Sequence, residues 1–88
     1  MEPVSRDFMT SLRILCFAQV RDSLGFAEKM LLCDPSATPR ALFASLDPYR
    51  RTEVPPSWRV ALDHEYVDWD DPVGTASELA ILPPVSGG

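Results

Sequence analysis

The residues best suited to chemistry in this sequence are the last two, Gly87 and Gly88. The final six residues read Pro-Pro-Val-Ser-Gly-Gly, in which the prolines favour an extended stem and the glycines form a tip without side chains. Six extended residues reach about 20 Å, far enough for a terminal carboxylate to enter a narrow active site of another protein. The chemistry this predicts is activation and transfer at the Gly88 carboxylate. Glycines are also common at frayed chain ends, and that interpretation stays open at this point.

Side chains that commonly act in catalysis are few elsewhere in the sequence. The single histidine, His64, falls in a predicted turn, and no GxSxG motif is present, which disfavours a serine or cysteine nucleophile with a histidine base. The sequence also lacks a P-loop and a GxGxxG motif, so we expect no nucleotide or other cofactor to bind in those modes. Cys16 and Cys33 form no CxxC pair, and we expect both to be buried free thiols.

The densest run of acidic side chains lies just after the expected turn at His64. A calcium loop that began at Asp68 would need Gly and Glu at the positions that Val73 and Leu79 occupy. We therefore expect no metal site, and instead a solvated acidic loop or a patch that meets a basic partner. The cluster consists of Glu65, Asp68, Asp70 and Asp71.

The length and charge of the chain limit the classes of protein to which it can belong. Its 88 residues, 45% hydrophobic and 24% charged, fit one globular domain. Its 8 basic against 13 acidic residues give a net charge of -5, which disfavours the basic surface that nucleic acids require. No apolar run approaches the roughly 18 residues of a transmembrane helix, and the N-terminus resembles no signal peptide. We expect a cytoplasmic protein that binds neither nucleic acid nor membrane.

The first half of the chain favours a hairpin of two strands followed by a helix. Side chains alternate between two faces over residues 12–20, a polar turn is expected over Arg21–Gly25, and a second strand over Glu28–Cys33 returns antiparallel. Thr38 can then cap a helix over Pro39–Leu46. The strand face expected to meet this helix holds Leu12, Ile14, Cys16, Ala18 and Val20.

The second half of the chain favours further strands. Asp63 and His64 tolerate left-handed backbone, which suits a tight turn between strands at Trp58–Leu62 and Tyr66–Val67. A last strand spans Glu78–Leu82. One main helix over a small mixed sheet predicts an α+β protein with the β-grasp architecture and an extended C-terminal tail. We expect a mobile extension over residues 1–10, the domain over residues 11–82, and a flexible tail over residues 83–88.

Three segments of the sequence match the pattern of a known family. Over residues 11–88 the chain resembles the small, sulfur-carrying subunit of molybdopterin synthase, a ubiquitin-like β-grasp protein, and the Pro-Pro-Val-Ser-Gly-Gly ending is the most specific part. The chain departs from the family in two turns, at Asp63-His64 and at residues 75–77. The matching segments are Leu15-Cys16-Phe17-Ala18 with Arg21-Asp22 and Gly25, residues 60–67, and residues 79–88.

The resemblance implies a function that depends on the tail. A ubiquitin-activating-like adenylyltransferase would use ATP to adenylate Gly88, and a sulfur donor would convert the adenylate to a thiocarboxylate. The chain would then dock on the large catalytic subunit, in a heterotetramer, and donate sulfur to cyclic pyranopterin monophosphate for molybdenum cofactor biosynthesis. The carrier itself would bind no cofactor and no metal, and would hold no complete active site.

Three other functions fit the same sequence. A sulfur carrier for thiamin thiazole synthesis would use the same activated Gly88. A ubiquitin-like modifier would instead attach Gly88 to lysines of target proteins. A plain interaction module would have an inert tail.

An uncovered sheet face provides the expected docking surface. Leu15 and Phe17 alternate away from the face that meets the helix, and the sequence contains no second helix to cover them. The alternative is that the loop at Tyr49–Ser57 folds over them. The residues expected to contact a partner are Leu15, Phe17, Leu82, Pro83, Pro84, Val85, Ser86 and Gly87.

Overall fold

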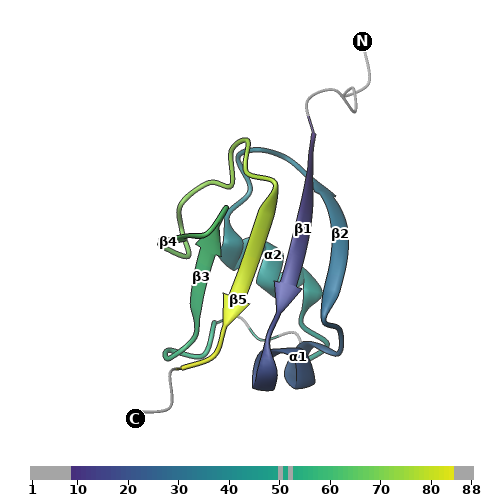
Figure 1. Ribbon diagram of the computed structural model, residues 1–88, viewed down its shortest axis with the longest axis vertical. Coiled ribbons are helices and arrows are strands. Elements are labelled where there is room, and N and C mark those ends of the chain that lie inside the picture. Colours follow the sequence, from purple (N-terminus) through teal and green to yellow (C-terminus); the bar gives the residue numbers. More distant parts are fainter. Residues whose placement is uncertain (1–8, 50, 52, 85–88) are drawn as a thin grey trace.

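A computed structural model describes residues 9–49, 51 and 53–84 of the chain. Five strands form one mixed sheet in the order β2-β1-β5-β3-β4, with β1 and β5 parallel and the other neighbours antiparallel. Figure 1 shows α2 behind the sheet and α1 at its lower end, so the face toward the viewer has no helix over it. The elements are β1 Thr10–Cys16, α1 Ala18–Leu24, β2 Glu28–Cys33, α2 Pro39–Leu46, β3 Arg59–Leu62, β4 Glu65–Val67 and β5 Glu78–Leu82.

The segment after β1 differs from the sequence prediction. A strand through Val20 and a turn after it were expected, and both are wrong, because β1 ends at Cys16 and α1 follows. Val20 and Leu24 stand one helical turn apart and are both buried, whereas Ala18, expected to face the core, is exposed. Gly25 ends the helix in the left-handed region, at φ 89°. The α+β mixed sheet is confirmed, with two helices where one main helix was expected.

Three other elements begin and end where the sequence placed them, whereas β3 begins at Arg59 instead of Trp58 and β4 begins at Glu65 instead of Tyr66. The bounds of β2, α2 and β5 match their predicted ranges. The hydroxyl of Thr38 accepts a hydrogen bond from the N–H of Ala41 at 3.2 Å, and Pro39 is the first residue of α2, as predicted. Asp63 and His64 have φ values of 47° and 73° and form the tight turn between β3 and β4.

The first strand begins one residue inside the segment that the sequence assigned to the N-terminal extension. Strand β1 includes Thr10, which pairs with Cys33 of β2, although the sequence had placed Thr10 in the extension. The predicted mobile extension otherwise falls largely on residues 1–8, which lie outside the described residues. In the described part of the chain, neither helix is long enough to cross a membrane.

The core lies between the sheet and α2. Phe43 of α2 packs edge-on against Trp58 and Trp69, with ring centroids 5.9 and 6.1 Å apart. Cys16 and Cys33 are buried free thiols, as expected, and burial raises the pKa of Cys16 to about 11. The other large side chains with almost no exposed surface are Leu12, Ile14, Val20, Pro39, Val60, Leu79 and Ile81, together with the polar side chain of Asp47.

An ion pair between buried Asp47 and half-buried Arg51 stabilises the segment after α2. The carboxylate of Asp47, whose side chain has 0% exposed surface, accepts hydrogen bonds from Nε and Nη2 of Arg51 at 2.7 and 3.1 Å. Arg51 also donates to the hydroxyl of Ser23 at 2.7 Å and lies over the rings of Phe43 and Trp58. These contacts attach the segment to both helices and to the core.

Candidate docking groove and tail exit

The face of the sheet without a helix carries one continuous row of side chains across four strands. Leu15 of β1 is paired with Ala80 of β5, Ala80 with Ala61 of β3, and Ala61 with Tyr66 of β4. Two small residues therefore lie between two large ones at the same level of the sheet. Because alternate residues of a strand share a face, this row is fixed by the pairing of the strands.

The row forms a shallow groove with an alanine floor. Leu15 and Tyr66 stand at its sides, and Phe17 and Leu82 continue it toward the end of β5. The groove has a volume of about 360 Å³, and no residue of the segment from 49 to 57 that the structure describes lines it. Phe17 is 45% exposed and Tyr66 is 69% exposed. The alternative, that the loop covers Leu15 and Phe17, does not hold for the described part of that loop.

One end of the groove is acidic. The carboxylate of Glu78 lies 3.6 Å from Nε2 of His64, and both residues line the groove. The turn beside them is held by Asp63, whose Oδ1 accepts the N–H groups of Ser77 and Glu78 at 2.9 and 3.0 Å. His64 is a solvent-exposed turn residue, and its ion-pair partner among the described residues is Glu78.

The opposite end of the groove is where the chain leaves the sheet. β5 lies between β1 and β3, and its last residue, Leu82, leads directly into Pro83 and Pro84. A second hollow beside this exit is lined by Pro84, Trp58 and Arg59, with Pro56 and Ser57. Val85, Ser86, Gly87 and Gly88, which the sequence predicts to be the chemical end of the molecule, lie outside the described residues.

The acidic cluster is divided between β4, which begins with Glu65, and a hydrogen-bonded loop after β4, which holds Asp68, Asp70 and Asp71; the prediction of one acidic loop is therefore wrong for Glu65. Asp71 accepts the N–H of Asp68 at 2.9 Å, and Asp68 accepts the N–H of Asp70 at 3.0 Å. Arg40 donates to Asp70 at 2.7 Å, and this hydrogen bond lowers the pKa of the Asp70 carboxyl. Within the described residues, no group of three or more His, Cys, Asp or Glu side chains is placed so that it could hold a metal ion.

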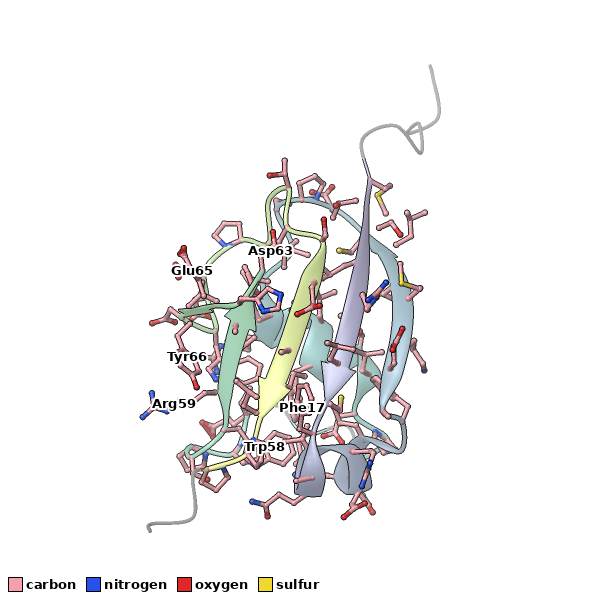
Figure 2. All side chains as sticks on the ribbon, in the orientation of Figure 1. Phe17, Trp58, Arg59, Asp63, Glu65 and Tyr66 are labelled. Carbon is pink, nitrogen blue, oxygen red and sulfur yellow. The ribbon has the colours of Figure 1, made fainter. Side chains whose placement is uncertain are left out.

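Tyr66 and Arg59 lie on the uncovered sheet face and were not singled out from the sequence. Tyr66 forms one side of the groove, and Arg59 lies at the tail end of the same face, paired in register with Leu82. Figure 2 shows Arg59 and Tyr66 projecting beside each other at the edge of the sheet, with Asp63 and Glu65 at the opposite end of that edge. The alternation of side chains along β3 places Arg59 and Ala61 on the same face of the sheet. The order of the strands, which the alternation does not contain, places Tyr66 on one side of these residues and Leu15 on the other.

Comparisons with known proteins agree with this geometry. A model described as the ThiS family matches residues 14–88. SAMP1 from Haloferax volcanii is 23% identical, covers 89% of this chain and 99% of its own, and superposes with a TM-score of 0.70. A putative molybdopterin converting factor, subunit 1, from Pyrococcus furiosus is 21% identical, with coverages of 86% and 99% and a TM-score of 0.68. A ubiquitin from Caldiarchaeum subterraneum is 13% identical, with coverages of 91% and 99% and a TM-score of 0.57. The shared fold is the ubiquitin-like β-grasp.

Proposed function

The chain belongs to the ThiS family, and from this membership we propose that it is a sulfur carrier that acts as the small subunit of molybdopterin synthase. The observation that supports the proposal most strongly is the way the chain leaves the fold. A central strand ends beside an exposed apolar groove and continues into Pro-Pro-Val-Ser-Gly-Gly. A partner that covers the groove would hold the tail at a fixed point and leave its last residues free to extend.

The proposed chemistry takes place at the Gly88 carboxylate. One carboxylate oxygen attacks the α-phosphorus of ATP, which gives an acyl-adenylate and releases pyrophosphate. A sulfur donor at the oxidation level of hydrosulfide then attacks the acyl carbon, and AMP leaves with the original oxygen. The carboxylate has exchanged one oxygen for sulfur, and no electron has been transferred.

The thiocarboxylate then transfers its sulfur on the large subunit. Two carriers supply the two sulfur atoms of one dithiolene on the cyclic pyranopterin monophosphate precursor. The chain contributes the reactive end and the docking surface, which consists of Leu15, Phe17 and Leu82 together with the tail from Pro83 to Gly87. The adenylyltransferase and the large subunit contribute the acid, base and nucleotide-binding groups.

Intact-mass measurement tests the proposed modification. The purified chain is incubated with its cognate adenylyltransferase, ATP and sulfide, and exchange of oxygen for sulfur should add about 16 Da. The mass of the chain from its own cells first verifies that Gly88 carries the free carboxylate. A variant that lacks Gly88 is the matched control and should gain no mass. An unchanged mass of the full chain in the presence of active enzyme would contradict the proposal.

The neighbours also support two related functions. The Pyrococcus furiosus neighbour is called a molybdopterin converting factor, which favours the molybdenum pathway. A Haloferax volcanii neighbour is called a small archaeal modifier protein, which favours the modifier, and a thiazole carrier would use the same Gly88 carboxylate. Co-purification with a large synthase subunit favours the first function. A stable adduct between Gly88 and lysines of other proteins favours the modifier.

A further inference from the structure

One edge of the sheet lacks the features that usually prevent a strand from pairing with another chain. Strand β2 ends the sheet beyond β1, at the right of Figure 1, and the described residues place no strand outside it. Its six residues pair with β1 in one continuous register, and none of them is proline. Protected edge strands are typically short, bulged, covered or interrupted by proline. The opposite edge of the sheet has such protection, because β4 contains only three residues.

The backbone groups along the outer edge of β2 are identified by the hydrogen bonds on its other side. The N–H of Cys16 donates to the carbonyl of Ala27 at 2.9 Å, so Ala27 and every second residue after it face β1. Glu28, Met30 and Leu32 therefore direct their N–H and C=O groups away from the sheet. Within the described residues, these outward groups have no hydrogen-bond partner.

The same three residues include the exposed apolar side chains of the strand. Met30 and Leu32 are 57% and 48% exposed. They share the sheet face of Leu15, which is paired with Glu28. The carboxylate of Glu28 lies 3.6 Å from Nε of Arg13 on β1. The outer edge of β2 therefore combines unpaired backbone groups with two apolar side chains and one charge that already has a partner.

We propose that β2 pairs antiparallel with β2 of a second copy of this chain, about a two-fold axis at Met30, so that two five-stranded sheets become one continuous sheet. In a two-fold pair the same surface serves both copies, so the edge must complement itself. Pairing Met30 with its own copy places Glu28 opposite Leu32 of the second copy. All three outward residues of each strand then exchange hydrogen bonds with the other strand.

Charge selects this register over its two neighbours. A shift in one direction places Lys29 opposite its own copy, and a shift in the other direction places Glu28 opposite Asp34. Like charges directly opposite each other on neighbouring strands destabilise the pair. In the proposed register Lys29 is opposite Leu31 of the second copy. The Nζ atom of Lys29 lies 4.7 Å from the centre of the Phe26 ring, which directs its charge away from the axis.

The pairing should be weak and reversible. One strand edge with two apolar side chains buries less than the roughly 800 Å² per partner of a standard interface. Each chain also carries a net charge of -5, which opposes association. No residue of β2 lines the docking groove, and the tail leaves from β5, so a paired chain still presents both to another protein. The inference is therefore independent of the proposed function.

Two lysine substitutions test the register, because they are matched in size, charge and exposure. Met30→Lys places two ammonium groups opposite each other at the axis, and the dissociation constant of the pair should rise at least about tenfold. Leu32→Lys places each new ammonium opposite Glu28 of the second copy, so its constant should stay within about threefold of the wild type. Sedimentation over a range of concentrations gives all three constants. A wild-type chain that stays monomeric up to about 1 mM, or equal effects of the two substitutions, would overturn the proposal.

Amide hydrogen exchange of the wild type tests the same edge without a substitution, and it decides the question if thermal unfolding shows that either variant does not fold. The outward amides of Met30 and Leu32 should exchange at least about threefold more slowly in a concentrated solution than in a dilute one, because pairing follows mass action. The amide of Leu31, which faces β1, should not respond to concentration. Exchange of the outward amides that is independent of concentration would overturn the pairing.

The modification assay separates this inference from the proposed function. Met30→Lys should gain about 16 Da with the adenylyltransferase, ATP and sulfide, as the wild type does, because the substitution leaves the groove and the tail unchanged. A wild type that pairs but gains no sulfur would overturn the proposed function and uphold the pairing. A wild type that gains sulfur but never pairs would overturn the pairing alone.

Discussion

Replacing Phe17 by Ala should weaken partner binding more than it destabilises the domain. A phenylalanine buries on the order of 200 Å² when it is fully covered, and Phe17 exposes 45% of its surface, so about 90 Å² remains for a partner to cover. At about 25 cal/mol per Å² this corresponds to roughly 2 kcal/mol, or a loss of about thirtyfold in affinity. Phe17 precedes α1 without a side-chain capping hydrogen bond, so alanine removes no polar contact there. The isolated domain should lose less than the about 3–5 kcal/mol typical of a buried phenylalanine.

Two paired measurements decide whether Phe17 belongs to the docking surface. Calorimetry with the adenylyltransferase gives the change in affinity, and denaturant unfolding gives the change in stability. Met30→Ala is the matched control, because Met30 is 57% exposed on β2 and does not line the groove. Equal losses of affinity for Phe17→Ala and Met30→Ala, or a loss of stability above about 3 kcal/mol with unchanged affinity, would refute the reasoning.

Three further predictions concern the rest of the chain. Asp47→Asn should cost about 1–3 kcal/mol in unfolding experiments, because it leaves the one-third exposed Arg51 guanidinium beside a neutral amide. Hydrogen bonding from Arg51 lowers the pKa of Asp47 in the folded state below the value of about 3.8 in the unfolded state. The stabilisation that the ionised Asp47 carboxylate provides is therefore fully present at neutral pH. It is lost as the pH falls below about 3.8 and through the lowered pKa. The difference between wild type and Asp47→Asn should therefore shrink in acid, and a constant difference would contradict this account. The Cys16→Ala and Cys33→Ala variants should still form the thiocarboxylate. Burial raises the pKa of both thiols, so neither forms the thiolate that acts as a nucleophile. Loss of the modification in a folded variant would show that a cysteine carries the sulfur. Removal of Gly88 should change the free energy of unfolding by less than about 0.5 kcal/mol, and a larger change would show that the end packs on the body.

Local signals predicted the elements whose ends are set by single residues. Thr38 and Pro39 define the start of α2, and the left-handed pair Asp63-His64 defines the turn between β3 and β4. Helix α1 was missed because apolar residues at alternate positions continue from β1 into Val20. The four-residue spacing of Val20 and Leu24, followed by Gly25, was the helical signal available.

The groove could be predicted only in part. Alternation placed Leu15 and Phe17 on the face away from the helix, and the structure keeps both in the groove. Tyr66 forms the opposite side of the groove, and Arg59 lies at the tail exit. The positions of both residues depend on the order of the sheet, in which β3 and β4 lie beyond β5. Pairing between distant strands is a property of the whole fold, so no local pattern in the sequence contains it.

Transfer of sulfur from the modified tail tests the central claim most directly. Thiocarboxylated chain is incubated with the cognate large subunit and cyclic pyranopterin monophosphate, and the masses of the carrier and the pterin product are followed together. The carrier should return to its unmodified mass by losing about 16 Da, and two carriers should be consumed for each dithiolene formed. A dithiolene product that forms while the Gly88 thiocarboxylate remains intact, or a thiocarboxylate that the large subunit and precursor never discharge, would contradict the account.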